Sequence, residues 1–123
     1  MGESGTLQRG SFDNPDEVRK PGRGTAKVVN VGEFGLMHVT LEPGWRWSED
    51  VKPIAKTDSC QAHHVIQMES GRMHVVHNDG SETEFGAGDL GLVSPGHDAW
   101  VVGDEPAVYL DITGSGVWDK PLR

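Results

Sequence analysis

The sequence predicts an all-β protein, an antiparallel jelly-roll β-barrel of one domain with a loose N-terminal arm. Three observations support this fold class. Apolar residues recur with a period of two from Thr25 onward, as in strands that bury one face. The chain has 17 glycines and 7 prolines, which supply turns between many short strands. No segment has the period of an amphipathic helix. A closed barrel also avoids the long exposed edges of a single sheet.

We expect the arm to end near residue 24. Residues 1–24 are polar and rich in glycine and charge, and they contain Pro15 and Pro21. This composition is typical of a loose terminal segment. Residues 25–123 then form the barrel domain.

The first barrel strands are expected around residues 28–31 and 36–41, where Met37, Val39 and Leu41 share one face. Residues 45–57 have no clear periodicity and predict a loop lying over a barrel end. Asn78-Asp79-Gly80 is a strong hairpin signal, because a tight hairpin turn needs positive φ angles. Further strands are expected at 62–68, 73–77, 82–85, 90–93, 99–102 and 108–112, the last with Val108, Leu110 and Ile112 in alternation.

Charge and composition exclude some partners. The formal net charge is −8, so a nucleic-acid partner is not expected, because little positive charge is present to neutralise phosphates. No apolar run approaches the length of about 18–20 residues that spans a membrane, so no membrane association is expected. Cys60 is the only cysteine, which rules out a disulfide within the chain and favours a reducing, cytoplasmic location.

Two blocks of the sequence resemble the cupin superfamily, specifically its small single-domain barrels. Residues 65–75 (VIQMESGRMHV) look like the first cupin hairpin, and residues 88–97 (GDLGLVSPGH) look like the second conserved segment. Gly88 follows Gly71 by about 17 positions, which is similar to the spacing in that family. The resemblance implies a jelly-roll barrel with an interior pocket, and it implies a homodimer.

The cupin metal motif is altered in this chain. When the blocks are aligned on Gly71, His64 takes the position of the family's glutamate, and Asp58 and Cys60 take the positions of two histidines. In the second block the family's histidine falls on Ala99, and His97 lies two residues earlier. The resemblance therefore does not carry over the unaltered ligand set or the activities that depend on it.

The altered residues still predict a candidate metal site. Asp58, Cys60 and His64 share one strand parity, and His97 comes from another strand. A thiolate with imidazoles suits zinc first, and iron or nickel next. The alternative is structural: a lone cysteine packs as a small hydrophobe, His64 is a hydrogen-bonded core histidine, and His97 orients the turn before it.

Aromatic residues and one further histidine are candidate ligand-binding residues. Trp45 and Trp47 either cover the mouth of a pocket or plug a barrel end. Trp100 lies in a barrel strand, where core packing is its simplest role. His77 shares its parity with Met73 and Val75 and is therefore a candidate for the interior.

These features lead to a small cupin that binds a divalent metal and a small organic ligand inside the barrel, as a metal-dependent isomerase, lyase or oxygenase. The alternative is a non-catalytic ligand-binding or sensing cupin without metal. A third possibility is a structural barrel with a filled interior. One fold serves many chemistries, so the sequence does not decide whether the protein is an enzyme.

Overall fold

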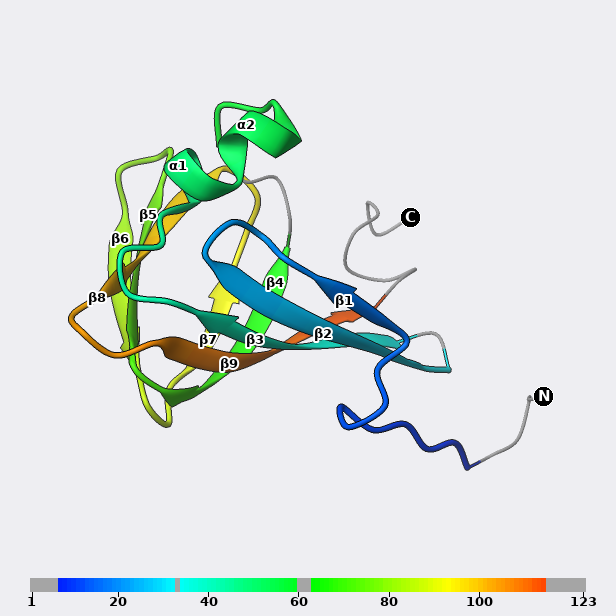
Figure 1. The fold of residues 1–123 in the computed structure, drawn as a ribbon. Coiled ribbons are helices and arrows are strands. Elements are labelled where there is room, and N and C mark those ends of the chain that lie inside the picture. The colour runs from blue at the N-terminus through cyan, green and yellow to red at the C-terminus, as the bar shows by residue number, and fades with distance from the viewer. Residues whose placement is uncertain (1–6, 33, 60–62, 115–123) are drawn as a thin grey trace.

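The computed structural model describes residues 7–32, 34–59 and 63–114, and it shows two antiparallel sheets facing each other (Figure 1). One sheet has the strand order β1-β2-β3-β9-β4-β7, and the other has the order β6-β5-β8. The all-β jelly-roll expectation is therefore confirmed. The strands are β1 (Glu17–Arg19), β2 (Gly24–Val31), β3 (Phe34–Leu41), β4 (His64–Ser70), β5 (Arg72–His77), β6 (Glu82–Gly86), β7 (Leu90–Val93), β8 (His97–Val102) and β9 (Ala107–Gly114).

The register of the large sheet sets which side chains face the interior. Ala26 pairs with Val39, Val39 pairs with Tyr109, and Tyr109 pairs with Met68. All four side chains are buried. Since residues two apart on a strand share a face, Met37, Leu41, Ile66 and Asp111 face the same interior.

The last strand buries the face opposite to its alternating apolar residues. Its buried residues are Ala107, Tyr109 and Asp111, whereas Val108, Leu110 and Ile112 are only partly buried. Both sets alternate equally well, so periodicity alone does not select the buried one. The consequence is that a carboxylate enters the barrel.

The small sheet supplies the opposite wall. Val75 pairs with Ala99 and Met73 pairs with Val101, and these four side chains are buried. Gly71, in the turn before β5, has a φ of 76°, and a Cβ there would lie 2.1 Å from the backbone oxygen of Pro106. Only glycine fits this turn, which agrees with its place in the first sequence block.

Two short helices replace the expected loop over one barrel end. They are α1 (Trp47–Asp50) and α2 (Lys52–Ala55). Both lie over one end of the barrel (Figure 1), where α1 contacts β8. Pro53 lies in the first turn of α2, where its missing N–H costs nothing. None of the helices that the structure describes has the length and apolar character needed to cross a bilayer.

Part of the segment before residue 24 is paired with the barrel. β1 pairs with β2 through Glu17, Val18 and Arg19. The Trp45 Nε1–H donates to the carbonyl oxygen of Pro21 at 2.7 Å. Its earlier part also contacts the barrel, since the Gln8 side chain accepts from the Gly32 N–H at 2.8 Å. These polar residues have a low propensity for strands, but backbone pairing with β2 at a free sheet edge overrides it.

Candidate functional site

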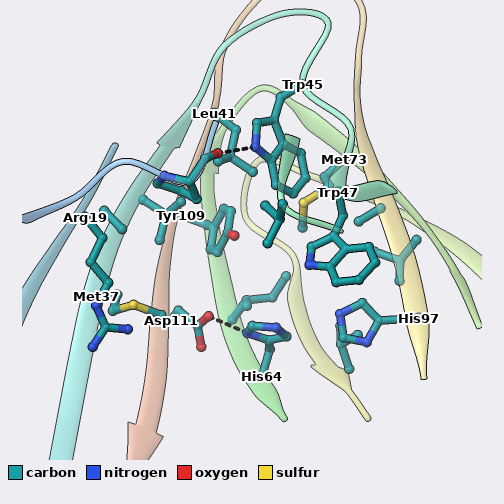
Figure 2. A pocket seen from close by; sticks show the side chains of 18 residues that line it. Arg19, Met37, Leu41, Trp45, Trp47, His64, Met73, His97, Tyr109 and Asp111 are labelled. Carbon is teal, nitrogen blue, oxygen red and sulfur yellow. Dashed lines mark hydrogen bonds and ion pairs between the residues drawn. The ribbon is translucent and has the colours of Figure 1, made fainter. Parts of the chain in front are cut away.

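A cavity of about 220 Å³ lies between the two sheets, and Figure 2 shows its lining. Its walls are mainly aliphatic, aromatic and methionine side chains, and a few polar groups reach it. Pockets of this character are typical small-molecule sites. The lining consists of Arg19, Pro21, Ala26, Met37, Val39, Leu41, Trp45, Trp47, Val51, His64, Ile66, Met73, Val75, Val93, His97, Ala99, Tyr109 and Asp111.

An aspartate and a histidine meet at one end of this cavity. His64 begins β4, and Asp111 lies on the neighbouring strand β9, opposite Ile66. They are diagonal neighbours on one face, within reach of each other. The His64 Nδ1 lies 2.5 Å from the Asp111 Oδ2, a short charge-assisted hydrogen bond. The carboxylate therefore orients the imidazole ring.

The second carboxylate oxygen of Asp111, Oδ1, is not hydrogen-bonded within the described residues. The Asp111 side chain is completely buried. Met37 on β3 lies opposite Asp111 and offers no donor. A buried acceptor without a partner is costly, so this atom is able to accept a further hydrogen bond.

His97 faces this pair from the other sheet. It begins β8, is only 4% exposed, and its ring centroid lies 5.3 Å from that of His64. The His97 Nδ1–H donates to the Ser94 carbonyl oxygen at 2.8 Å. In the neutral ring this leaves Nε2 as the acceptor atom. The two histidines thus come together from two sheets, as the sequence expected.

Trp45 and Trp47 cover the cavity beside the helices. Both are buried and line it, and Figure 2 shows both indoles on the same side as Met73. The ligand-contact and plug interpretations therefore converge on one place. The hydrogen bond from Trp45 to Pro21 ties this cover to the N-terminal segment.

Arg19 reaches the cavity from β1, the edge strand of the large sheet. Its Nε and Nη2 donate to the two carboxylate oxygens of Glu17 at 2.8 and 3.2 Å. This bond lowers the pKa of the Glu17 carboxyl and raises the pKa of Arg19. The positive charge at this rim is therefore already balanced by a carboxylate.

Two expected site residues lie elsewhere. The Asp58 side chain is fully exposed, 4.0 Å from the Lys52 Nζ, and does not line the cavity. The interior position expected for it is wrong, because residues 56–59 lie outside any regular strand, where strand parity does not apply. Cys60 lies outside the described residues.

Trp100 also lies outside the cavity. It is on the outer face of β8, where its ring stacks on His74 at 4.9 Å and Arg46 lies 4.1 Å from the ring centroid. The core role expected for Trp100 is wrong, because its neighbours Ala99 and Val101 take the inner face. His74 of β5 pairs with Trp100 and lies on the same outer face.

His77 is on the inner parity of β5, opposite His97. Its Nε2 donates to the Pro95 carbonyl oxygen at 2.8 Å. It lines a separate hollow of about 130 Å³ with Glu82, Thr83 and Phe85, and it is absent from the lining of the main cavity. A direct role for His77 at the main site is therefore not supported.

Sequence reasoning missed three polar residues of the lining: Arg19, Tyr109 and Asp111. The signal for Asp111 was present, since a lone carboxylate lies amid apolar residues in the last strand. A charge in an otherwise apolar strand is either outward or functional, and only the register decides. The sequence did not indicate that Arg19 lines the cavity, because its segment was predicted to be a loose arm.

The described residues fit a metal ion only in part. Metal-binding histidines usually donate their other ring N–H to a carboxylate or a backbone carbonyl. His64 and His97 both do this through Nδ1. However, within residues 7–32, 34–59 and 63–114 no three His, Cys, Asp or Glu side chains are grouped as a metal site. Two imidazoles alone fall short of the usual three or four protein ligands.

Several solved structures share this fold. An oxalate decarboxylase from Lactobacillus farciminis is 17% identical with a TM-score of 0.61, covering 91% of this chain and 33% of its own. A protein of unknown function from Rhizobium leguminosarum bv. viciae 3841 is 19% identical with a TM-score of 0.63, covering 88% and 96%. A mutant of Bacillus subtilis oxalate decarboxylase is 25% identical with a TM-score of 0.56, covering 84% and 29%.

These likenesses confirm the architecture that the two sequence blocks predicted. The chain shares the fold of these proteins. It spans about a third of the length of the oxalate decarboxylases that it matches. No family model matches the sequence, and no curated protein sequence matches it significantly.

Proposed function

We propose that this cupin binds a small, largely apolar organic molecule in its barrel cavity, with one polar group at the histidine end. The cavity carries the proposal, because it is an apolar space on which polar groups converge at one end. This combination gives affinity through the walls and orientation through the polar groups.

The histidine end also supports proton transfer on a bound molecule. The Asp111 carboxylate holds the Nδ1 proton of His64, which makes the opposite nitrogen, Nε2, the basic atom of the ring. A histidine held in this way is suited to act as a general base or acid. An isomerisation or lyase reaction that moves a proton is therefore the reaction class that we propose to test first, once a ligand is known.

A second candidate adds a divalent metal at the same end, bound by His64 and His97 through Nε2. The observation that favours it is the Nδ1 hydrogen bond of each ring. The Bacillus subtilis oxalate decarboxylase that resembles this chain contains Mn(II) centres, so manganese joins zinc, iron and nickel as ions to test. A bound metal would supply Lewis-acid polarisation of a ligand oxygen.

Ligand binding is tested by blocking the cavity. Ala99→Phe adds a ring where the Ala99 side chain lines the cavity, whereas the exposed Ala55 of α2 provides a matched Ala55→Phe control. The assay is thermal stabilisation by small acids, alcohols, amides and amines. We expect at least one compound to stabilise the unaltered protein and the control but not Ala99→Phe. Stabilisation by none, or equal stabilisation of Ala99→Phe, overturns the proposal.

The metal is tested separately by elemental analysis of purified protein after supplementation with each ion. About one ion per chain, lost in both His64→Gln and His97→Gln, supports the second candidate. Retention in both variants places the ion elsewhere. The Cys60→Ser variant then tests whether the thiol expected from the sequence contributes.

A further inference from the structure

The polar end of the cavity presents hydrogen-bond acceptors, and their arrangement identifies the kind of ligand group that fits. Asp111 Oδ1 is completely buried and has no partner in the described part of the chain. Because a carboxylate oxygen only accepts, the missing partner is a donor. The ligand group beside Asp111 must therefore carry an N–H or an O–H.

His97 strengthens this requirement from the opposite sheet. Its Nδ1–H is already committed to the Ser94 carbonyl oxygen, so the neutral ring offers an acceptor at Nε2. His97 is buried and lines the same cavity as Asp111. A ligand group with several N–H donors can donate to both residues. A carboxylate on the ligand has no donor and would face acceptor atoms at both residues.

Charge favours the same group. Among the described residues, the ion pair recorded for Asp111 is with His64, and no lysine or arginine pairs with it. A buried carboxylate surrounded by apolar walls needs a nearby positive charge. Arg19, the arginine of the lining, is bonded to the exposed Glu17 at the rim.

The rest of the cavity suits the hydrocarbon part of such a ligand. Trp45 and Trp47 are aromatic walls, and Met73 lies on the same side (Figure 2). Aromatic faces attract cations as well as apolar groups. We propose that the cavity selects a small primary amine, with its ammonium group at Asp111 and His97 and its apolar body against the tryptophans. This inference rests on the proposed function and specifies its ligand class.

The test compares probes that share a phenyl ring and differ in their head group. Isothermal titration of the full chain in EDTA is carried out with 2-phenylethylamine, 2-phenylethanol and 3-phenylpropanoate. We expect the amine to bind at least about tenfold more tightly than the alcohol, because hydrogen bonds to charged groups are the stronger ones. The carboxylate is expected to bind more weakly than either.

Two substitutions assign the head-group contact. Asp111→Asn keeps the shape and removes the charge, and it is expected to weaken amine binding by about tenfold or more while alcohol binding changes little. Asp58→Asn is the matched control, because the Asp58 side chain is exposed and does not line the cavity, and it is expected to leave amine binding unchanged. If Asp111→Asn does not fold, His97→Leu replaces it, with the same expected loss for the amine.

The outcomes separate this inference from the proposed function. Tighter binding of 3-phenylpropanoate, abolished in Arg19→Gln, overturns the amine class and leaves the cavity as a ligand site. A parallel titration of the amine is carried out without EDTA. Amine binding that appears there and is absent in EDTA overturns the inference as well, because the amine then binds a metal rather than Asp111. If none of the three probes binds, and the wider screen with the Ala99→Phe control also fails, the proposed function fails too.

Discussion

The Nδ1 atom of His64 lies 2.5 Å from the Oδ2 atom of Asp111, across adjacent strands and inside the barrel. This contact places a carboxylate–imidazole pair at the end of an apolar cavity. Such a pair is expensive to bury unless both partners remain. Burying this pair in a small barrel costs free energy, which ligand binding would offset. The coupling between the two side chains leads to the first prediction.

Removing only the histidine should destabilise the fold. His64→Leu leaves the Asp111 carboxylate buried without its partner, and we expect it to lower the free energy of unfolding by about 3 kcal/mol. Urea unfolding measures this. The double variant His64→Leu/Asp111→Leu should recover a large part of the loss. If the losses measured for the single variants His64→Leu and Asp111→Leu simply add up in the double variant, the pair is not coupled as described.

The indole of Trp45 should hold the N-terminal segment against the barrel. Trp45→Phe removes the donor to the Pro21 carbonyl, and we expect a loss of about 1 kcal/mol in stability. Amide hydrogen exchange of residues 17–19 should accelerate at the same time. Trp100→Phe is the control, because Trp100 lies on the outer face of β8. Equal acceleration in both variants would show that the segment is held by other contacts.

Asp50 should stabilise the protein in a pH-dependent way. Its side chain is 9% exposed and accepts hydrogen bonds from the Arg23 side chain and the Arg46 N–H. The Arg23 hydrogen bonds hold the pKa of the Asp50 carboxyl below its usual range. The contribution is therefore complete above the ordinary aspartate pKa of about 3.9. It is lost as the pH falls below that value through the folded-state pKa.

The Asp50→Asn variant tests the direction of this pH dependence. At pH 7 we expect a loss of about 1–2 kcal/mol relative to the unaltered protein. The difference should shrink steadily as urea unfolding is repeated from about pH 4 downward. The exposed Glu105, in the last turn, provides a Glu105→Gln control. A difference that stays constant down to pH 2 would contradict the described ion pair.

The homodimer expected from the sequence remains a prediction, and the outer face of the large sheet is where we expect it. Leu90 and Leu92 on β7 are 74% and 67% exposed. In the register of the sheet, Leu92 pairs with Val65, which pairs with Ile112, so the apolar face continues across three strands. Burying such a face is the usual source of stability in homodimers.

Light scattering tests the dimer. The unaltered protein should have twice the mass of one chain, and Leu90→Lys/Leu92→Lys should be monomeric. Ile54→Lys is the matched control, since Ile54 is 70% exposed on α2, away from that face. A monomeric unaltered protein, or a dimer that survives the double change, would contradict the assignment.

The local sequence determined most of the strands and turns. Gly71, Gly80, Gly88 and Gly96 all have positive φ, a conformation that glycine adopts without steric cost, and they lie between the strands that the sequence predicted. The alternation of Met37, Val39 and Leu41 likewise indicated the correct inner face of β3. These features depend only on neighbours along the chain.

Tertiary structure decided which of two alternating faces enters the barrel and which distant residues meet there. The last strand alternates in either reading, and only its pairing with β3 and β4 turns Tyr109 and Asp111 inward. The position of Arg19 in the lining depends on β1 joining a sheet edge. The alternation of side chains along a strand gives it two faces. Pairing with strands that are distant in the sequence decides which face is buried.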